Sequence, residues 1–405
     1  MVAAAWLSAV TTVLFSVEHL PGPLGLDTTT PRFSWKGSGG SASTSTTRGV
    51  RQTEYRLQVA AAEAALAAGP YVWDSGSVPS NASHLVAYSG SAALGAGRPY
   101  FARVLVSYNA GESSEDAAAP VASAAVRFSI APTAVGSSYA AKFIGLPAVH
   151  HAPSPPGPAP APGPGPAASL PFNQSSCPWL RKTFTLGAFA PSAGDSALIA
   201  VGSVGFHELW VNGEKATDDV LSPSVSDLAK RVLVRTYDIA PLLKPGKNTI
   251  GLWLSTGWAG FNSVNPAKTN LFNVSHAPLA MAELSVFQAG HQTMTLLTDA
   301  SWKASPSDTA HIGAWKNGNF GGDRVDARLS QPGWSVTATD DSAWSAAEVY
   351  ALPPGIMLAS EILEPNRMRE VSRRSKRLRL FRVHRYYSWL TGGGAEHRLW
   401  LPRRS

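Results

Sequence analysis

Short segments of alternating apolar and polar residues, separated by turn-forming residues, run through most of this 405-residue chain. In residues 53–60, Tyr55, Leu57 and Val59 alternate with polar side chains. In residues 100–108, one face carries Tyr100, Ala102, Val104, Val106 and Tyr108. Successive side chains of a β-strand point to opposite faces, so this period of two predicts strands with one buried face. No alternation of strands with helical segments of suitable length occurs, which favours an all-β chain over an α/β chain.

Residues 17–131 are predicted to form a first β-sandwich. Clusters of Gly, Pro, Asn and Ser separate the strand segments there, as is typical of a sandwich. Ala-rich residues 60–69 predict one short helix that ends at Gly69-Pro70. Residues 1–16 form an apolar N-terminal segment without the basic start of a secretory signal.

A second sandwich, of jelly-roll type, is predicted for residues 132–350. It excludes residues 152–168, whose repeated prolines predict an extended linker or insert because proline fixes φ and removes a hydrogen-bond donor. Asn212-Gly213 lies between two strand segments, and this dipeptide suits the two positive φ angles of a type I′ hairpin turn. Six tryptophans are expected to pack in the sandwiches: Trp35, Trp73, Trp210, Trp253, Trp302 and Trp344.

The net charge of +7 comes from the C-terminal tail. The chain has 34 Lys and Arg and 27 Asp and Glu, but residues 372–405 hold ten of the basic residues and one of the acidic ones, so the rest is close to neutral. The tail has no regular period and is predicted to be a disordered, basic non-domain segment. Neither it nor the body shows a nucleic-acid-binding module, and no apolar run is long enough to cross a membrane.

The cysteine content and the N-glycosylation triplets give information on the cellular compartment and on metal binding. Cys177 is the one cysteine, so no intrachain disulfide and no cysteine metal cluster can form. Three N-x-S/T triplets, at Asn81, Asn173 and Asn273, fit a secreted glycoprotein without establishing one. The localisation stays open, with secretion favoured.

Several segments resemble one family in their order along the chain. The first sandwich carries PLGLDTTTPRFSW at 23–35, GVRQTEYRLQVA at 49–60, WDSGSV at 73–78 and GRPYFARV at 97–104. The second carries AAKFIG at 140–145, WLRKTFTL at 179–186, the block 201–258, GGDRVDAR at 321–328 and DDSAWSAAEV at 340–349. Together they resemble the N-terminal domains of the bacterial-type α-L-rhamnosidases of glycoside hydrolase family 78. The resemblance implies a fibronectin-type-III-like sandwich followed by a carbohydrate-binding-type sandwich, with residues 351–371 beginning a third, truncated β domain.

The resemblance also implies where catalysis takes place. Enzymes of that family hydrolyse terminal α-L-rhamnose, and their two catalytic carboxyl groups lie in a helical barrel further along the chain. This sequence has no counterpart of the barrel, so we expect no catalytic residue and no activity from the chain alone. Asp218, Asp219, Asp323 and Asp326 are instead expected to be solvated turn residues.

A sugar-binding site is the functional hypothesis that these residues support. Aromatic faces and carboxylate or amide groups hold sugars, and oxygen-rich loops can also hold Ca²⁺. The candidates are Asp218 and Asp219 after the hairpin, with Trp258, Asn262 and Asn265 in the loop that follows a later strand. Asp219 and Asn265 are the candidate calcium ligands, and no other cofactor is expected.

Three functions remain open from the sequence. The first is the accessory, N-terminal part of an α-L-rhamnosidase-like hydrolase, with a rhamnose-containing glycan or glycoside as partner. The second is a non-catalytic rhamnose- or carbohydrate-binding protein, and the third is a structural adhesion or scaffold protein. Glycan specificity and oligomeric state are not fixed by any motif in the chain.

Overall fold

The computed structural model describes the chain in segments: residues 10, 12–38, 50–109, 119–132, 139–147, 175–191, 195–260, 277–288, 291–312, 322–352, 354–363 and 365–368. Residues 1–367 form one compact unit and residues 368–405 another, of which Met368 is the described residue. The proline-rich segment and the basic tail therefore lie outside the described residues, and their predicted states stay predictions.

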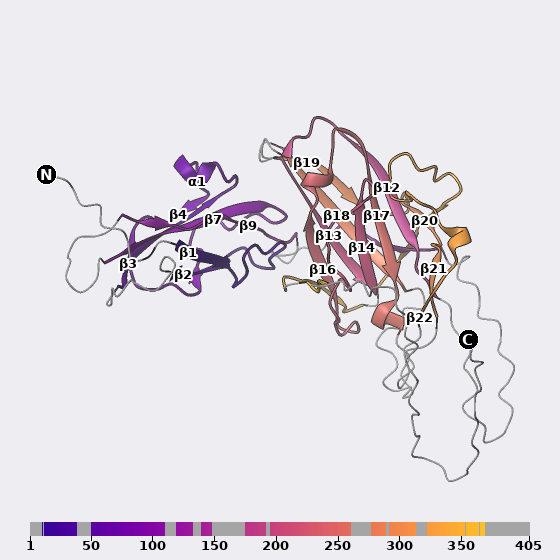
Figure 1. The fold of residues 1–405 in the computed structure, drawn as a ribbon, viewed down its shortest axis with the longest axis horizontal. Helices are drawn as coiled ribbons and strands as arrows, with labels where there is room; N and C mark the ends of the chain where they lie inside the picture. The colour runs from indigo at the N-terminus through magenta and orange to yellow at the C-terminus, as the bar shows by residue number, and fades with distance from the viewer. Residues whose placement is uncertain are drawn as a thin grey trace, which may run out of the picture. The chain divides into compact units, whose positions relative to one another are not determined.

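The first sandwich consists of two antiparallel sheets, drawn in indigo to violet in Figure 1. One sheet has the order β1-β2-β6, and the other has the order β4-β3-β7-β8, with β5 paired to β3 and β9 paired to β7. The elements are β1 (Thr12–Val17), β2 (Arg32–Ser38), β3 (Gln52–Ala60), α1 (Ala65–Ala68), β4 (Trp73–Asp74), β5 (Val78–Pro79), β6 (Val86–Ala87), β7 (Pro99–Tyr108), β8 (Val121–Ala122) and β9 (Val126–Ser129).

The core of the first sandwich follows the alternation seen in the sequence. In β7 the side chains of Ala102, Val104 and Val106 are completely buried, whereas those between them are partly exposed. Phe33 of β2 and Phe128 of β9 are also completely buried, with ring centroids 6.3 Å apart in an edge arrangement. The period of two therefore identified the buried face of this strand, and α1 ends at Gly69 as expected.

The second sandwich pairs a seven-stranded sheet with a six-stranded sheet. The first has the order β24-β10-β18-β13-β16-β25 with β19 on β18, the second has the order β15-β14-β17-β12-β20-β23, and β11-β21-β22 form a small third sheet. Its strands are β10 (Phe143–Gly145), β11 (Ser175–Ser176), β12 (Trp179–Leu186), β13 (Ser196–Val204), β14 (Phe206–Val211), β15 (Glu214–Lys215), β16 (Arg231–Asp238), β17 (Gly246–Ser255), β18 (Leu279–Gln288), β19 (His291–Leu297), β20 (Lys303–Ser305), β21 (Thr309–Ile312), β22 (Gly322–Val325), β23 (Ser345–Ala346), β24 (Glu348–Tyr350) and β25 (Met357–Ser360). Short 3₁₀ helices are η3 (Ala240–Leu242), η4 (Gly257–Gly260) and η6 (Ala327–Leu329).

The hairpin of β14 and β15 confirms the predicted turn. Asn212 and Gly213 have φ angles of 52° and 91°, which are the positive values of a type I′ turn. The turn is fixed further by the amide of Asn212, which donates to the backbone oxygen of Leu242 at 2.8 Å.

Two boundaries differ from those that the sequence suggests. Residues 12–16 belong to β1, which pairs with β2 over its full length, so they are part of the first sandwich and not of a separate apolar segment. Residues 357–360 form β25, which runs parallel to β16, so they complete a sheet of the second sandwich instead of opening a third domain.

The predicted tryptophan positions are packed, and two further tryptophans join them. Trp35, Trp302 and Trp344 are buried, and Trp73, Trp210 and Trp253 pack partly buried against core residues. Trp179 stacks on Trp334 at 5.4 Å and on Trp344 at 6.2 Å on the outer face of the β12-containing sheet. A side chain at Gly251 would lie 2.6 Å from the Trp334 ring, so this cluster needs a glycine in β17.

Replacing Gly205 with alanine is expected to lower the free energy of unfolding by at least about 3 kcal/mol. Gly205 has a φ of 113°, and a Cβ there would overlap the backbone oxygen of Ser255 and lie 3.0 Å from that of Thr256. Gly76→Ala is the control, because its φ is 65° and nothing lies within 4 Å, so only about 1–2 kcal/mol of left-handed strain is expected. Equal losses for the two variants in urea unfolding would contradict the overlap.

Candidate functional site

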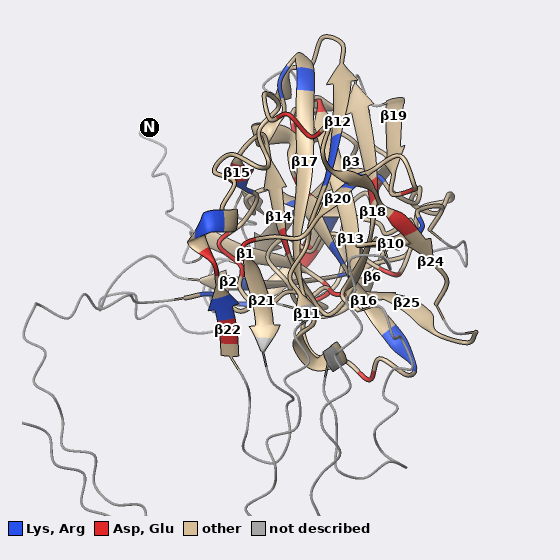
Figure 2. Cartoon of the chain, turned by 90° about the vertical axis from the view of Figure 1, so that its right-hand side faces the viewer, with Lys and Arg blue, Asp and Glu red and all other residues tan. Residues whose placement is uncertain are grey.

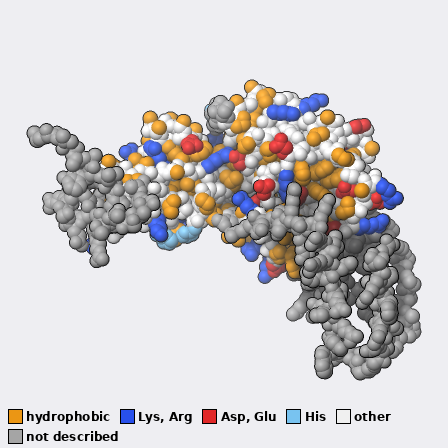
Figure 3. Space-filling view, in the orientation of Figure 1, with side chains coloured by type: hydrophobic (Ala, Val, Ile, Leu, Met, Phe, Trp, Pro, Cys, Tyr) orange, Lys and Arg blue, Asp and Glu red, His pale blue; other side chains and the backbone are white. Residues whose placement is uncertain are grey.

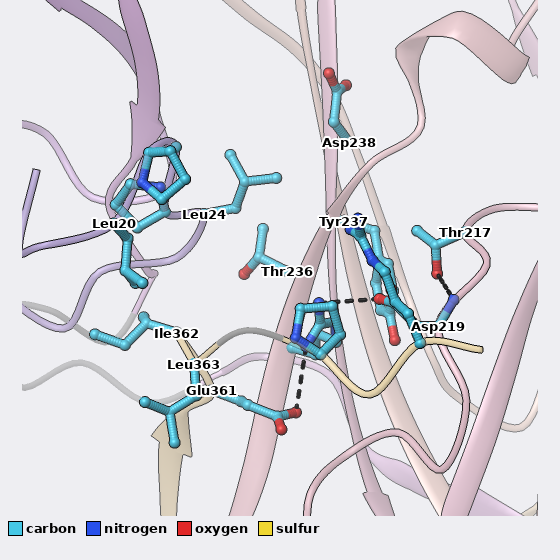
Figure 4. Close-up of a pocket in the computed structure, with 16 residues that line it drawn as sticks. Leu20, Leu24, Thr217, Asp219, Thr236, Tyr237, Asp238, Glu361, Ile362 and Leu363 are labelled. Atoms are coloured by element: carbon cyan, nitrogen blue, oxygen red, sulfur yellow. Dashed lines mark hydrogen bonds and ion pairs between the residues drawn. The ribbon is translucent and has the colours of Figure 1, made fainter. Parts of the chain in front are cut away.

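A cavity of about 490 Å³ lies beside the C-terminal half of β16, and Figure 4 shows the side chains that line it. Arg235, Thr236, Tyr237 and Asp238 come from β16, and Thr217 and Asp219 come from the segment after the hairpin. Glu361, Ile362, Leu363, Pro365 and Arg367 come from the segment after β25, and Leu20–Leu24 complete the lining. Polar and apolar groups thus face the same space.

Four charged side chains form the polar wall of this cavity. Nη2 of Arg235 lies 2.9 Å from Oδ2 of Asp219, and Nη1 lies 3.9 Å from Oε2 of Glu361. Nε of Arg367 lies 3.4 Å from Oδ1 of Asp219. Asp219 and Glu361 are 4% and 6% exposed, so two buried carboxylates are balanced by two guanidinium groups. Burial of these charges is tolerated because they are paired.

Several polar atoms of the cavity lining lack a hydrogen-bond partner among the described residues. They are Oδ2 of Asp219, Nε of Arg235, Oγ1 of Thr236 and Oε2 of Glu361. The contact of Arg235 with Asp219 is therefore close enough for an ion pair but does not have hydrogen-bond geometry. These donors and acceptors are buried, and no described residue satisfies them.

The segment after β25 is fastened to the segment after the hairpin by three contacts. Oε1 of Glu361 accepts a hydrogen bond from the backbone N–H of Ser224 at 2.8 Å. The backbone N–H of Val220 donates to the oxygen of Asn366 at 3.0 Å, and Asp219 forms an isolated β-bridge with Arg367. Because these contacts join residues far apart in sequence, the position of Asp219 depends on residues 361–367.

A chain of buried hydrogen bonds runs behind Arg235. Ser203 Oγ donates its hydrogen to the backbone oxygen of Gly205. It therefore accepts a hydrogen bond from the Nδ1–H of His207, at 2.8 Å. Nε2 of His207 then accepts from the hydroxyl of Tyr237 at 2.9 Å, and that hydroxyl lies 3.2 Å from Oγ of Ser222. The guanidinium of Arg235 also lies 5.6 Å from the centre of the Tyr237 ring.

Burial determines the charge state of this chain of groups. Burial, together with the nearby charge of Arg235, lowers the pKa of His207 from 6.5 to about 3. Burial also raises the pKa of Tyr237 well above its usual value of 10.0. Both side chains are therefore neutral near pH 7. They form hydrogen bonds beside β16 without adding charge there.

The stability of the protein is expected to fall as the pH drops below about 6.5. His207 takes up a proton near pH 6.5 in the unfolded chain but only near pH 3 in the folded chain, so its contribution is complete above pH 6.5 and is lost as the pH falls toward 3. Between pH 6.5 and pH 5 this loss amounts to about 2 kcal/mol. His207→Gln, which keeps a donor and an acceptor, should flatten that slope in urea unfolding. An unchanged slope in the variant would contradict this assignment.

The structure separates the two aspartates that the sequence proposed together. Asp218 is exposed, as expected of a turn residue, but Asp219 is buried and paired with Arg235 and Arg367. The expectation of solvated aspartates is therefore wrong for Asp219, because neighbouring residues on an extended segment face opposite ways. Trp258 lies in η4 after β17 and is 38% exposed, and it does not line the cavity.

The loop residues Asn262 and Asn265 lie outside the described residues, so their proposed contacts with a sugar stay predictions. The calcium site proposed at Asp219 and Asn265 meets a physical difficulty at Asp219. Its carboxylate is shared by two guanidinium groups, which repel a divalent cation, so the donor set found at Asp219 does not fit Ca²⁺. In the described segments no cluster of three or more His, Cys, Asp or Glu residues is arranged to hold a metal ion.

Sequence reasoning missed Arg235, Glu361 and Arg367. Arg235 lies in a strand, where a charged residue is expected to face the solvent, yet its side chain is only 12% exposed. Glu361 and Arg367 lie in the segment assigned to a third domain, more than 120 residues after the hairpin. No spacing rule connects residues of such separation, so only the pairing of β25 with β16 reveals the site.

Basic and acidic residues alternate along the side of the molecule that Figure 2 draws. Figure 2 shows Lys and Arg interspersed with Asp and Glu on the strands and turns. Among the described ion pairs, most join residues on neighbouring strands or turns, such as Arg56 with Asp74 and Arg32 with Glu18. No helix found in these segments combines the length and apolar character that a membrane crossing requires.

The fold places the chain in a class of proteins with two successive β-sandwich domains, the second bearing a polar cavity. Two family models match it. The model described as "Rha78A-like, N-terminal immunoglobulin domain" matches residues 13–125, and the model described as "Alpha-L-rhamnosidase N-terminal domain" matches residues 193–370. By these two matches, the chain carries the N-terminal β-sandwich domains of the α-L-rhamnosidase family.

Known relatives agree with this assignment. An α-L-rhamnosidase of Formosa agariphila is 25% identical over 343 residues, and one of an Alteromonas species is 25% identical over 342 residues. Each match covers 84% of this chain and 33% of the relative, so the chain spans about a third of the length of these relatives. The structure of an α-L-rhamnosidase from Dictyoglumus thermophilum is 25% identical, with a TM-score of 0.67, over 90% of this chain and 37% of that one. The Streptomyces avermitilis α-L-rhamnosidase, solved with L-rhamnose, shares the fold with a TM-score of 0.68 at 21% identity, over 87% of this chain and 46% of that one.

Proposed function

We propose that this chain serves an α-L-rhamnosidase as an accessory region, and that the cavity beside β16 binds the rhamnose units of rhamnose-containing glycans. The observation that carries the proposal is the wall formed by Asp219, Arg235 and Glu361. This wall lies within the part of the chain that matches the α-L-rhamnosidase N-terminal domain.

The chemistry of the cavity suits a neutral, hydroxyl-rich ligand. Carboxylates accept hydrogen bonds from sugar hydroxyls, and guanidinium groups donate to them. Ile362, Leu363, Leu20 and Leu24 add apolar surface that can meet the C–H face and the methyl group of a deoxy sugar. Because the two buried carboxylates are already balanced by two cations, a ligand with no net charge leaves the electrostatics of the wall unchanged.

Access to the wall depends on Arg367. Its side chain is 66% exposed, and it lies over the carboxylate of Asp219, which is 3% exposed. A long exposed side chain changes rotamer at little cost, so Arg367 can move aside when a ligand binds. Arg367→Ala is therefore expected to leave sugar binding intact or to strengthen it, in contrast to a change at Asp219.

Hydrolysis is not proposed for this chain by itself. Glycoside hydrolysis needs one carboxyl group to give a proton and another to act as base or nucleophile. Asp219 and Glu361 share Arg235 as an ion-pair partner, an arrangement that suits structure or binding. We therefore assign hydrolysis of the rhamnoside bond to a separate catalytic domain that acts together with this chain.

The proposal is tested by separating binding from turnover. The purified chain is applied to an immobilised rhamnose-bearing polysaccharide and to the same material after enzymatic removal of its terminal rhamnose. Retention on the first alone supports the proposal, and equal retention or none contradicts the binding part of it. In parallel, release of product from an aryl α-L-rhamnoside by the chain, above the level of a mock purification, would contradict the accessory role.

A further inference from the structure

We propose that His19 and His84, on the surface of the first sandwich, form a two-histidine site for a transition-metal ion such as Zn²⁺ or Ni²⁺. Neither histidine lines the cavity beside β16, and neither takes part in the proposed sugar binding.

The two imidazole rings lie close together on an open surface. Their centroids are 5.2 Å apart and their planes are inclined by 41°. Both side chains are exposed, and the histidines of the first sandwich form a visible patch in Figure 3. No hydrogen bond to either ring is found among the described residues, so the ring nitrogens are available to a ligand.

The separation fits shared metal coordination. Zinc binds an imidazole nitrogen at about 2.0–2.1 Å and prefers tetrahedral angles, which puts the centres of two bound rings about 5 Å apart. The observed centroid distance of 5.2 Å matches that value. Water or a third group can fill the remaining positions, as at sites with open coordination. Imidazole is also a ligand that suits Zn²⁺, Ni²⁺ and Cu²⁺.

The backbone holds both histidines in place. His19 has a φ of 67° in a turn that is closed by reciprocal hydrogen bonds between Val17 and Leu20 at 2.9 and 3.0 Å. The neighbouring Glu18 is clamped by Arg32, whose Nη2 lies 2.6 Å from its carboxylate.

His84 lies in a loop that is fixed on both sides. The Trp35 N–H donates to the Ser83 oxygen at 2.9 Å, and the Leu85 N–H donates to Oγ of Ser34 at 2.9 Å. Because the backbone at both histidines is already ordered, little conformational entropy is lost when a metal ion binds the two rings.

The site is tested by titrating the full chain, without a histidine tag, with ZnCl₂ and separately with NiCl₂ in a calorimeter. One equivalent of metal is expected to bind, and His84→Ala or His19→Asn should weaken binding at least tenfold. Asparagine is chosen at position 19 because it tolerates positive φ. His291→Ala is the matched control, since His291 is an exposed histidine on β19 and should leave the titration unchanged.

A second readout distinguishes a lost site from a damaged fold. The metal is expected to raise the melting temperature of the unaltered chain through binding to the folded state, and not that of the His19→Asn/His84→Ala double variant. The double variant should keep its melting temperature in the absence of metal. Metal binding of unchanged affinity in the double variant, or equal loss in His291→Ala, would overturn the proposal.

Discussion

Replacing Arg181 with methionine is expected to lower the free energy of unfolding by about 3–5 kcal/mol. Arg181 is 1% exposed on β12, and its Nη1 donates to Asp341 at 2.6 Å and to the backbone oxygen of Thr339 at 3.2 Å. Its Nη2 donates to the oxygen of Val336 at 2.8 Å, and its guanidinium lies 5.8 Å from the centre of the Trp344 ring. Methionine fills a similar volume but leaves these acceptors without a donor.

The loss should be accompanied by a local change. Residues 331–344 lie on the outer face of the β12-containing sheet, so releasing them should alter the near-UV circular dichroism of the stacked Trp179, Trp334 and Trp344. Arg56→Met is the control, because Arg56 is 48% exposed and its pair with Asp74 is worth less than about 1 kcal/mol. A similar loss for both variants would show that Arg181 does not anchor this segment.

Replacing Asp219 with alanine is expected to abolish L-rhamnose binding and to cost about 3–5 kcal/mol of stability. The change leaves the guanidinium of Arg235, which is 12% exposed, with only the carboxylate of Glu361 at 3.9 Å. A buried charge that loses its partner carries an uncompensated desolvation cost. Thermal unfolding and calorimetric titration of the same preparation report the two effects.

Asp218→Ala is the matched control for Asp219. The two residues are neighbours in the chain, but Asp218 is exposed, so its replacement should change stability by less than about 0.5 kcal/mol and leave binding intact. To separate binding from stability, Asp219→Ala is titrated only after its circular dichroism spectrum has been matched to that of the unaltered chain. Binding lost in Asp218→Ala and kept in Asp219→Ala would place the sugar on the other side of this segment.

Local sequence patterns predicted individual strands and one turn because these follow from nearest-neighbour chemistry. The alternation in residues 100–108 gave the buried face of β7, and Asn212-Gly213 gave the turn between β14 and β15. The buried Ile250, Leu252 and Leu254 of β17 show the same period of two. The motif order identified the family, as the matches to residues 13–125 and 193–370 confirm.

The cavity could not be predicted in the same way because its residues meet only through strand pairing. Asp219, Arg235 and Glu361 come from three segments, and the parallel pairing of β25 with β16 brings them together. A run of four residues such as Met357–Ser360 carries no signal for the strand that it joins. Because local patterns do not reveal strand pairing, residues 351–371 were assigned to a new domain and Asp219 was expected to be solvated.

The most direct test of the central claim is a calorimetric titration of the purified chain with L-rhamnose, with and without Ca²⁺, alongside Asp219→Ala and Asp218→Ala. The account predicts saturable heat for the unaltered chain and for Asp218→Ala, and none for folded Asp219→Ala. It also predicts that calcium makes no difference at Asp219, since two guanidinium groups already occupy that carboxylate. No heat from the unaltered chain up to tens of millimolar sugar, or binding that Asp219→Ala retains, would contradict a rhamnose site beside β16.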